Sequence, residues 1–203
     1  MPHLRAPRAR RLAALILSAF ISTPLLACPA GQVEVCLAQC LCVSDPDGSL
    51  DALQKQVRQV AAPALAGWLQ RARDQAVAEG VEPIPLNLRV QLRDYYPDEV
   101  LDAARYRVGD SQQLDAANAM LQNEDVAAVT LVDVIVFRDA KAAQNDLALW
   151  AHELQHVQQY RKLGVDGFAE RYVRNYNELE SPAYAIQNQV EQAQRRVTQQ
   201  THK

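Results

Sequence analysis

The stretch WAHELQHVQQY, residues 150–160, contains the pattern His-Glu-x-x-His. On an α-helix His152 and His156 are four residues apart and leave the same face, so both imidazoles can bind one metal ion. Glu153 is turned about 100° from His152 around the helix, within reach of a water beside that metal. Two imidazole ligands, a third donor and an open fourth position are the arrangement of a catalytic zinc site.

The residues around this pattern favour one uninterrupted helix over residues 139–160. That segment has no Pro or Gly, and apolar side chains recur in it at helical spacing, at Ala142, Leu147, Trp150, Leu154 and Val157. The chain has four histidines, at positions 3, 152, 156 and 202, so half of them lie in the pattern. The alternative is a surface helix whose two histidines are only solvated.

Residues 1–27 have the composition of a signal peptide. Four arginines, at positions 5, 8, 10 and 11, precede an apolar run over residues 12–26. This run is short for a membrane span but suits the apolar core of an export signal. We therefore expect an exported protein, periplasmic or secreted, with no transmembrane segment in the mature chain.

Residues 28–48 form a cysteine-rich N-terminal segment that contains all four cysteines, at positions 28, 36, 40 and 42. An even number in an exported chain favours two disulfides. The residues Leu25-Leu26-Ala27-Cys28 also resemble the lipobox of bacterial lipoproteins, and on that alternative Cys28 carries a lipid anchor on an outer-membrane lipoprotein. A cysteine zinc cluster is a third alternative, without the usual paired CxxC spacing.

Residues 49–203 are expected to form a single domain, since roughly 175 residues remain after the leader, enough for one core. The net charge of the whole chain is −3. The chain has no basic stripe and no cluster of stacking aromatics, so nucleic acid is not expected as a partner.

The sequence pattern predicts an α+β fold that is mainly helical. A small sheet is expected to place an edge strand beside the helix of residues 139–160, and in zinc peptidases of this general design such a strand pairs with the extended substrate. Asp133 is expected to face solvent, the alternative being the cleft. The predicted elements are a helix over 49–79 capped by Ser49 and kinked or divided at Pro63, a strand over 86–92, helices over 98–108 and 111–122, a β segment over 126–137, a loop over 162–167, a helix over 168–176 and a last helix opened by residues 177–184, with Pro182 in its first turn.

The third metal ligand is expected to be a carboxylate. A third histidine is nearly excluded, because His3 leaves with the leader and His202 lies one residue from the end of the chain. Glu178 and Glu180, at the start of the last helix, are the candidates. Either could instead be a charge that interacts favourably with the helix dipole.

From about Leu88 to Gln187 the chain resembles the metallopeptidase core domain of effectors associated with extracellular contractile injection systems, a domain of the gluzincin group. The resemblance rests on Val129-Thr130 to Ile135-Val136-Phe137-Arg138, on residues 151–160, and on Glu180 with Ala183-Tyr184. It implies a zincin-like domain that binds Zn²⁺ through His152, His156 and Glu180, with Glu180 preferred to Glu178. Gluzincins often have an acidic residue four positions after this glutamate. Here that position is Tyr184, whose hydroxyl is an alternative partner for a ligand histidine.

The expected function is that of a zinc-dependent metallopeptidase that hydrolyses a peptide or protein substrate, with Glu153 as the general base. The candidates for stabilising the oxyanion are Tyr160, Tyr172, Arg174 and Tyr176. Two alternatives remain open. One is a binding or cargo module that keeps the fold without catalysis, and the other is a zinc amidase that acts on cell-wall peptides.

Overall fold

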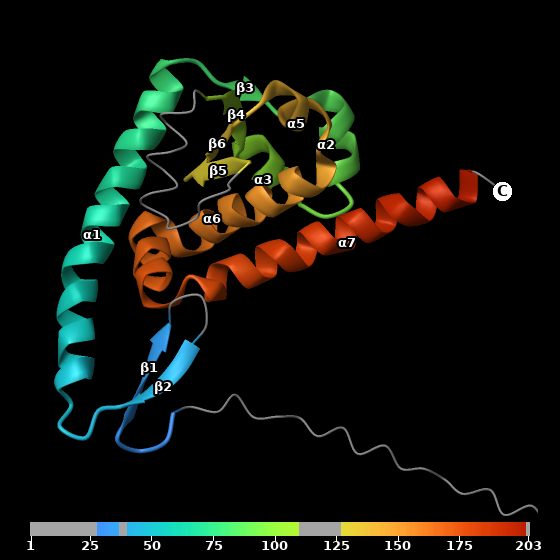
Figure 1. Ribbon diagram of the computed structural model, residues 1–203. Helices are drawn as coiled ribbons and strands as arrows, with labels where there is room; N and C mark the ends of the chain where they lie inside the picture. Colours follow the sequence, from blue (N-terminus) through green and yellow to red (C-terminus); the bar gives the residue numbers. More distant parts are fainter. Residues whose placement is uncertain (1–27, 37–39, 110–126, 202–203) are drawn as a thin grey trace, which may run out of the picture.

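The computed structural model describes residues 28–36, 40–109 and 127–201, which are mainly helical with two small sheets (Figure 1). The predicted α+β class is therefore confirmed. The signal segment and the helix predicted over 111–122 lie outside the described residues. In chain order the elements are β1 (Gln32–Cys36), β2 (Cys40–Ser44), α1 (Ser49–Ala78), β3 (Glu82–Pro83), α2 (Leu86–Leu92), α3 (Asp98–Ala103), β4 (Arg105–Val108), β5 (Ala128–Leu131), β6 (Val134–Phe137), α5 (Ala140–Asn145), α6 (Leu147–Asn175) and α7 (Asn177–Thr201).

The larger sheet has the strand order β3-β4-β6-β5, with β5 at an edge next to α6. The strands β4 and β6 are parallel, and the other two pairs are antiparallel. The predicted β segment over 126–137 is thus a hairpin and not one strand. Its turn places Val132 at φ 63°, a left-handed conformation that is unusual for a β-branched residue.

Asp133 in this hairpin turn binds α1. Its carboxylate oxygens accept hydrogen bonds from Nε and Nη2 of Arg73 at 2.8 and 2.9 Å. The carboxylate is partly exposed, and it faces Arg73 instead of the cleft that the alternative interpretation of the sequence considered. The ion pair therefore connects α1 to the turn between β5 and β6.

The helix α1 is continuous through Pro63, which was predicted to kink or divide it. Pro63 and Gln59 are both exposed, so water can solvate the carbonyl that loses its hydrogen bond to the proline. The helix start also differs from the prediction. The carboxylate of Asp45, and not the Ser49 side chain, accepts from the backbone N–H groups of Leu50 and Asp51, at 3.0 and 2.8 Å.

Residues 86–92 form the helix α2, so the strand predicted there is wrong. Leu88 and Leu92 are buried, whereas Leu86 and Val90 are exposed. The alternating pattern of the sequence also places two leucines four residues apart, which suits a helix that buries one face. Burial of Leu88 and Leu92 in the core accompanies the helical choice.

The helix predicted over 98–108 is also partly wrong, because α3 ends at Ala103 and residues 105–108 form β4. This short strand pairs in parallel with β6, from Arg105 opposite Val134 to Val108 opposite Phe137. The pairing partner is distant in sequence, and local periodicity carries no information about it.

The helix predicted over 139–160 is divided into α5 and α6. Asp139 and Asp146 cap the two helices, each accepting from a backbone N–H three residues later at 2.9 Å. The helix α6 then continues to Asn175 with a kink at Gly164, where φ is 70°. The predicted loop over 162–167 is reduced to this kink, and the helix predicted over 168–176 is the second part of α6.

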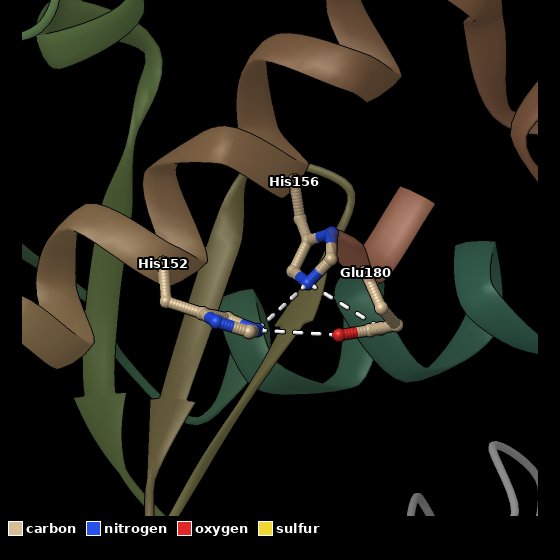
Figure 2. Close-up of side chains that lie close together, drawn as sticks. All are labelled: His152, His156 and Glu180. Atoms are coloured by element: carbon tan, nitrogen blue, oxygen red, sulfur yellow. Dashed lines mark hydrogen bonds and ion pairs between the residues drawn. The ribbon is translucent and has the colours of Figure 1, made fainter. Parts of the chain in front are cut away.

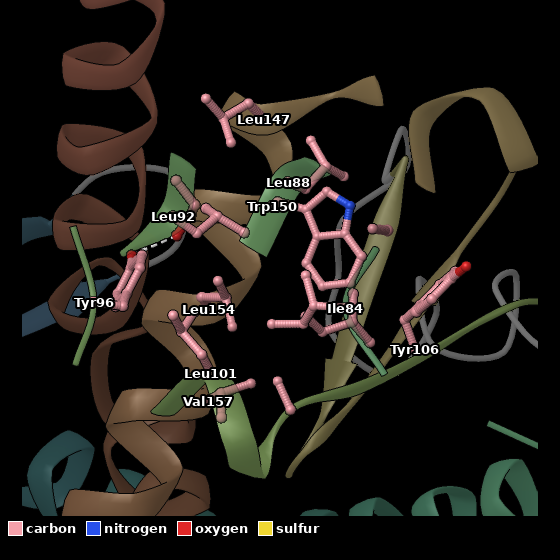
Figure 3. Close-up of a cluster of buried hydrophobic side chains, with 14 of the residues drawn as sticks. Ile84, Leu88, Leu92, Tyr96, Leu101, Tyr106, Leu147, Trp150, Leu154 and Val157 are labelled. Carbon is pink, nitrogen blue, oxygen red and sulfur yellow. Dashed lines mark hydrogen bonds between the residues drawn. The ribbon is translucent and has the colours of Figure 1, made fainter. Parts of the chain in front are cut away.

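Two buried clusters fix α6 between the other elements. In the first, shown in Figure 3, Trp150 lies among leucines of α2, α3 and α6, with its ring centre 4.8 Å from that of Phe137 and 5.4 Å from that of Tyr106. The Trp150 indole N–H donates to the carbonyl of Ala143 at 2.8 Å. The second cluster joins α1, β5, β6, α6 and the start of α7 through residues that include Leu65, Leu69, Val136, Phe168 and Leu179.

The Trp150→Ala variant should have a free energy of unfolding lower by about 3–5 kcal/mol than wild type. The substitution leaves a large cavity in the first cluster and removes the hydrogen bond from the indole to the Ala143 carbonyl. Val90→Ala, at an exposed position of α2, should change it by less than about 0.5 kcal/mol. Urea denaturation with a chelator present measures both values without a contribution from metal. Equal stabilities of the two variants would contradict the central position of Trp150.

The N-terminal strands β1 and β2 form a separate antiparallel hairpin, and a disulfide joins Cys28 to Cys42. This bond uses the sulfur that the lipobox alternative would acylate. The side chains of Cys36 and Cys40 lie outside the described part of the structure, and the second expected disulfide with them. No helix in the described ranges is long and apolar enough to span a membrane.

Candidate metal centre

His152, His156 and Glu180 come together between α6 and α7 (Figure 2). The two histidine Nε2 atoms are 3.2 Å apart. The Nε2 atom of His152 is 3.3 Å from Oε2 of Glu180, and that of His156 is 3.5 Å from Oε1. Tetrahedral zinc with bonds of about 2.0 Å separates its ligand atoms by about 3.3 Å. The two Nε2 atoms therefore have the spacing of two zinc ligands, and each lies at about that spacing from one of the two Glu180 oxygens.

The structure brings Glu180, and not Glu178, to the histidines. Glu178 accepts a hydrogen bond from Nη2 of Arg174 at 2.7 Å, and its side chain is 39% exposed. The Glu180 side chain is 14% exposed and faces both imidazoles. Of the two carboxylates that the sequence left open, Glu180 is the one positioned to complete the ligand set. Because α7 already begins at Asn177, Pro182 lies inside this helix, beyond the first turn that was predicted for it.

Electrostatics at this site favour a positive charge between the three side chains. Burial alone lowers the pKa of His156, but the hydrogen bond and negative charge of Glu180 outweigh it and raise the pKa to about 9. Burial likewise raises the pKa of Glu180, yet its hydrogen bonds to His152 and His156 lower it to about 2. A largely buried carboxylate held in this ionised form beside two imidazoles suits a bound cation.

Glu153 is held by the edge strand β5. It is only 3% exposed, and the Thr130 hydroxyl donates to its Oε2 at 2.7 Å. The same hydroxyl lies 3.1 Å from the Glu153 backbone carbonyl. Thr130 thus fixes one carboxylate oxygen. Its role was not predicted, although a hydroxyl among apolar strand residues was a visible signal.

The two histidines differ in what holds them. The Nδ1 atom of His156 lies 2.9 Å from Oε1 of Gln159, whereas Nδ1 of His152 is buried and has no hydrogen-bond partner among the described residues. Tyr184 packs its ring edge-on against His152, with ring centres 4.7 Å apart, and so does not provide the hydrogen bond considered for it. Gln159 was not singled out in the sequence, where its position three residues after His156 was the available signal.

A small cavity of about 40 Å³ adjoins His152, Glu153, His156 and Glu180. This volume is enough for an ion with water. Its lining includes Tyr160 and Tyr172 among the four residues considered for oxyanion stabilisation, but not Arg174 or Tyr176. Burial raises the pKa of both lining tyrosines, so their hydroxyls keep their protons at neutral pH. Arg174 is instead paired with Glu178.

A family model matches the part of the chain that runs from α2 to the first part of α6. No curated protein and no solved structure matches the chain. The matched segment contains Thr130, His152, Glu153 and His156 and ends before Glu180, so it is shorter at its C-terminal end than the resemblance drawn from the sequence. Residues 83–164 match the family model of the eCIS core domain, and this match supports an association with extracellular contractile injection systems.

Proposed function

We propose that this protein is an exported zinc metallopeptidase that hydrolyses peptide bonds in a peptide or protein substrate. The observation that carries the proposal is the spacing of the donor groups. The two histidine Nε2 atoms are 3.2 Å apart, and each lies 3.3 or 3.5 Å from one of the two carboxylate oxygens of Glu180. Two neutral imidazoles and one carboxylate are the ligand set of catalytic zinc sites that keep a fourth position for water or substrate.

Zinc in this site would acidify a water toward a pKa of about 7 and polarise the substrate carbonyl. Glu153 accepts the proton of that water and passes it to the leaving amine. Thr130 donates to one carboxylate oxygen of Glu153, which orients the other for this transfer. Tyr160 and Tyr172, whose protonated hydroxyls can donate, are the candidates for stabilising the developing oxyanion, because both side chains line the cavity.

The edge strand β5 is the proposed binding surface for the substrate backbone. In the described sheet β5 pairs only with β6, and its residues Ala128, Val129 and Thr130 line the cavity. An extended peptide that pairs with this edge would place a carbonyl near the three donors. Backbone pairing gives affinity without demanding a particular sequence.

Purified mature protein should contain about one zinc ion per chain and cleave casein or members of a peptide library. A chelator should abolish cleavage, and added Zn²⁺ should restore it, because the attacking water would be activated only by the bound ion. Elemental analysis and mass spectrometry of the products measure the two quantities. A protein that binds no zinc under any condition tested would contradict the proposal.

A second candidate function is a binding or cargo module that keeps the zinc for structural reasons. The observation in its favour is the burial of the site, where both histidines are only 7% exposed and the cavity is small. Bound zinc without cleavage of any peptide would favour this module. A screen that includes cell-wall peptides separates a peptidase from an amidase that uses the same residues.

A further inference from the structure

We infer that Gln159 is a positioning residue, which sets the tautomer of His156 and ties this ligand to the segment that carries Glu180. The inference rests on the proposed zinc site, but the contacts that carry it belong to the chain itself. Gln159 lies on α6 one helical turn after His156 and is 8% exposed. A buried amide must satisfy its hydrogen bonds within the protein.

Both ends of the Gln159 side chain are used. Its Nε2 donates to the backbone carbonyl of Leu179 at 2.8 Å, and its Oε1 lies 2.9 Å from Nδ1 of His156. The orientation of the amide is fixed by chemistry, because the Leu179 carbonyl can only accept and therefore must face the NH₂ group. The opposite orientation would place two acceptor oxygens against each other.

This orientation decides which nitrogen of His156 keeps its hydrogen when the ring is a neutral metal ligand. The Gln159 oxygen has no proton to give, so Nδ1 of His156 must be the donor. With Nδ1 protonated, the lone pair of the neutral ring is at Nε2. That atom is the one 3.2 Å from Nε2 of His152 and 3.5 Å from Glu180. The Leu179 carbonyl thus selects the metal-binding tautomer through one amide.

The same amide joins two ligands that come from different helices. Leu179 directly precedes Glu180 and is itself buried in the second cluster. The bond from Gln159 therefore holds the start of α7 against α6, which sets the distance between His156 and Glu180. Hydrogen-bond partners of this kind orient ligand histidines and strongly affect metal affinity.

No amide of this kind holds His152 in the ranges that the structure describes. Its Nδ1 has no hydrogen-bond partner among the described residues, and the edge of the Tyr184 ring packs against its imidazole. Within the described part of the chain, Gln159 is therefore the side chain that orients a ligand imidazole through the nitrogen facing away from the site. Loss of Gln159 should loosen a site in which the other histidine is held by packing.

The test measures zinc affinity by competition with a chromogenic chelator in wild type, Gln159→Leu and Gln158→Leu. The leucine at 159 keeps the size of the side chain but forms neither hydrogen bond, and it should weaken zinc binding by about 10–100-fold. Gln158→Leu makes the same change one residue away, at a half-buried position. It should leave zinc affinity within about twofold, as expected away from the ligands.

A nuclear magnetic resonance signature separates tautomer control from a merely structural role. In zinc-loaded wild type with ¹⁵N-labelled histidine, the Nδ1 proton of His156 should appear at the low field typical of a hydrogen-bonded ring N–H. It should move to higher field in Gln159→Leu and stay at low field in Gln159→Glu, because the carboxylate still accepts from Nδ1.

The possible results separate the inference from the proposed function. If wild type binds zinc and Gln159→Leu binds it equally well, the inference is wrong and the zinc site stands. If wild type binds no zinc, both are wrong. Should Gln159→Leu fail to fold, the wild-type spectrum decides alone, since a His156 proton on Nε2 with Nδ1 unprotonated would overturn the assignment.

Discussion

Zinc affinity should fall by more than about 100-fold in the Glu180→Ala variant, because this variant loses a ligand. Substitution of a residue that only hydrogen-bonds to a ligand lowers metal affinity by about 10–100-fold. In the structure Glu180 is the carboxylate within 3.5 Å of both histidine Nε2 atoms. Its removal leaves two imidazoles, which cannot form the three-residue set of a catalytic zinc site. Chelator competition and elemental analysis measure the loss.

Glu178→Ala is the matched control for this experiment. It removes the same group from the same helix, but from an exposed residue paired with Arg174. Exposed ion pairs contribute about 1 kcal/mol or less, so stability and zinc binding should both remain close to wild type. Loss of zinc from Glu178→Ala with retention in Glu180→Ala would reverse the ligand assignment.

Glu153→Gln should reduce the rate of peptide hydrolysis by about 10³-fold while zinc remains bound, since general base catalysis contributes about 10²–10⁴-fold. The amide has the shape of the carboxylate and can still accept from Thr130, but it cannot take a proton from water. Initial rates on a fluorogenic peptide, together with metal content, provide the measurement.

Glu170→Gln makes the same chemical change at an exposed position of α6 and should leave both the rate and the zinc content unchanged. Turnover of Glu153→Gln at the wild-type rate would remove Glu153 from the mechanism. Loss of zinc along with activity would instead assign Glu153 to the metal site.

Long-range contacts, both core packing and strand pairing, explain most differences between the predicted and the observed secondary structure. Residues 86–92 alternate like a strand but form α2, and residues 105–108 become β4 by pairing with β6. The turn at Val132 and Asp133 contains no glycine or asparagine, the residues that would have indicated a turn in the sequence. Its strained Val132 is held within a hairpin that Arg73 of α1 contacts through Asp133, 60 residues away in sequence. No local pattern could indicate these partners.

The positions of His152, Glu153 and His156 on one helix followed from the sequence alone, because residues four apart on any α-helix share a face. The choice between Glu178 and Glu180 could not follow from it. Two residues apart on a helix, they point in directions about 160° apart around the helix axis, and only the packing of α7 against α6 decides which one faces the histidines.

The sequence by itself determined the mainly helical α+β class and the pair of histidines, because both depend on periodicity within a single element. The tertiary structure decided the third carboxylate, the hydroxyl of Thr130 beside Glu153 and the amide of Gln159 beside His156. These contacts join β5, α6 and α7, and their distances arise only when the buried clusters bring the elements together.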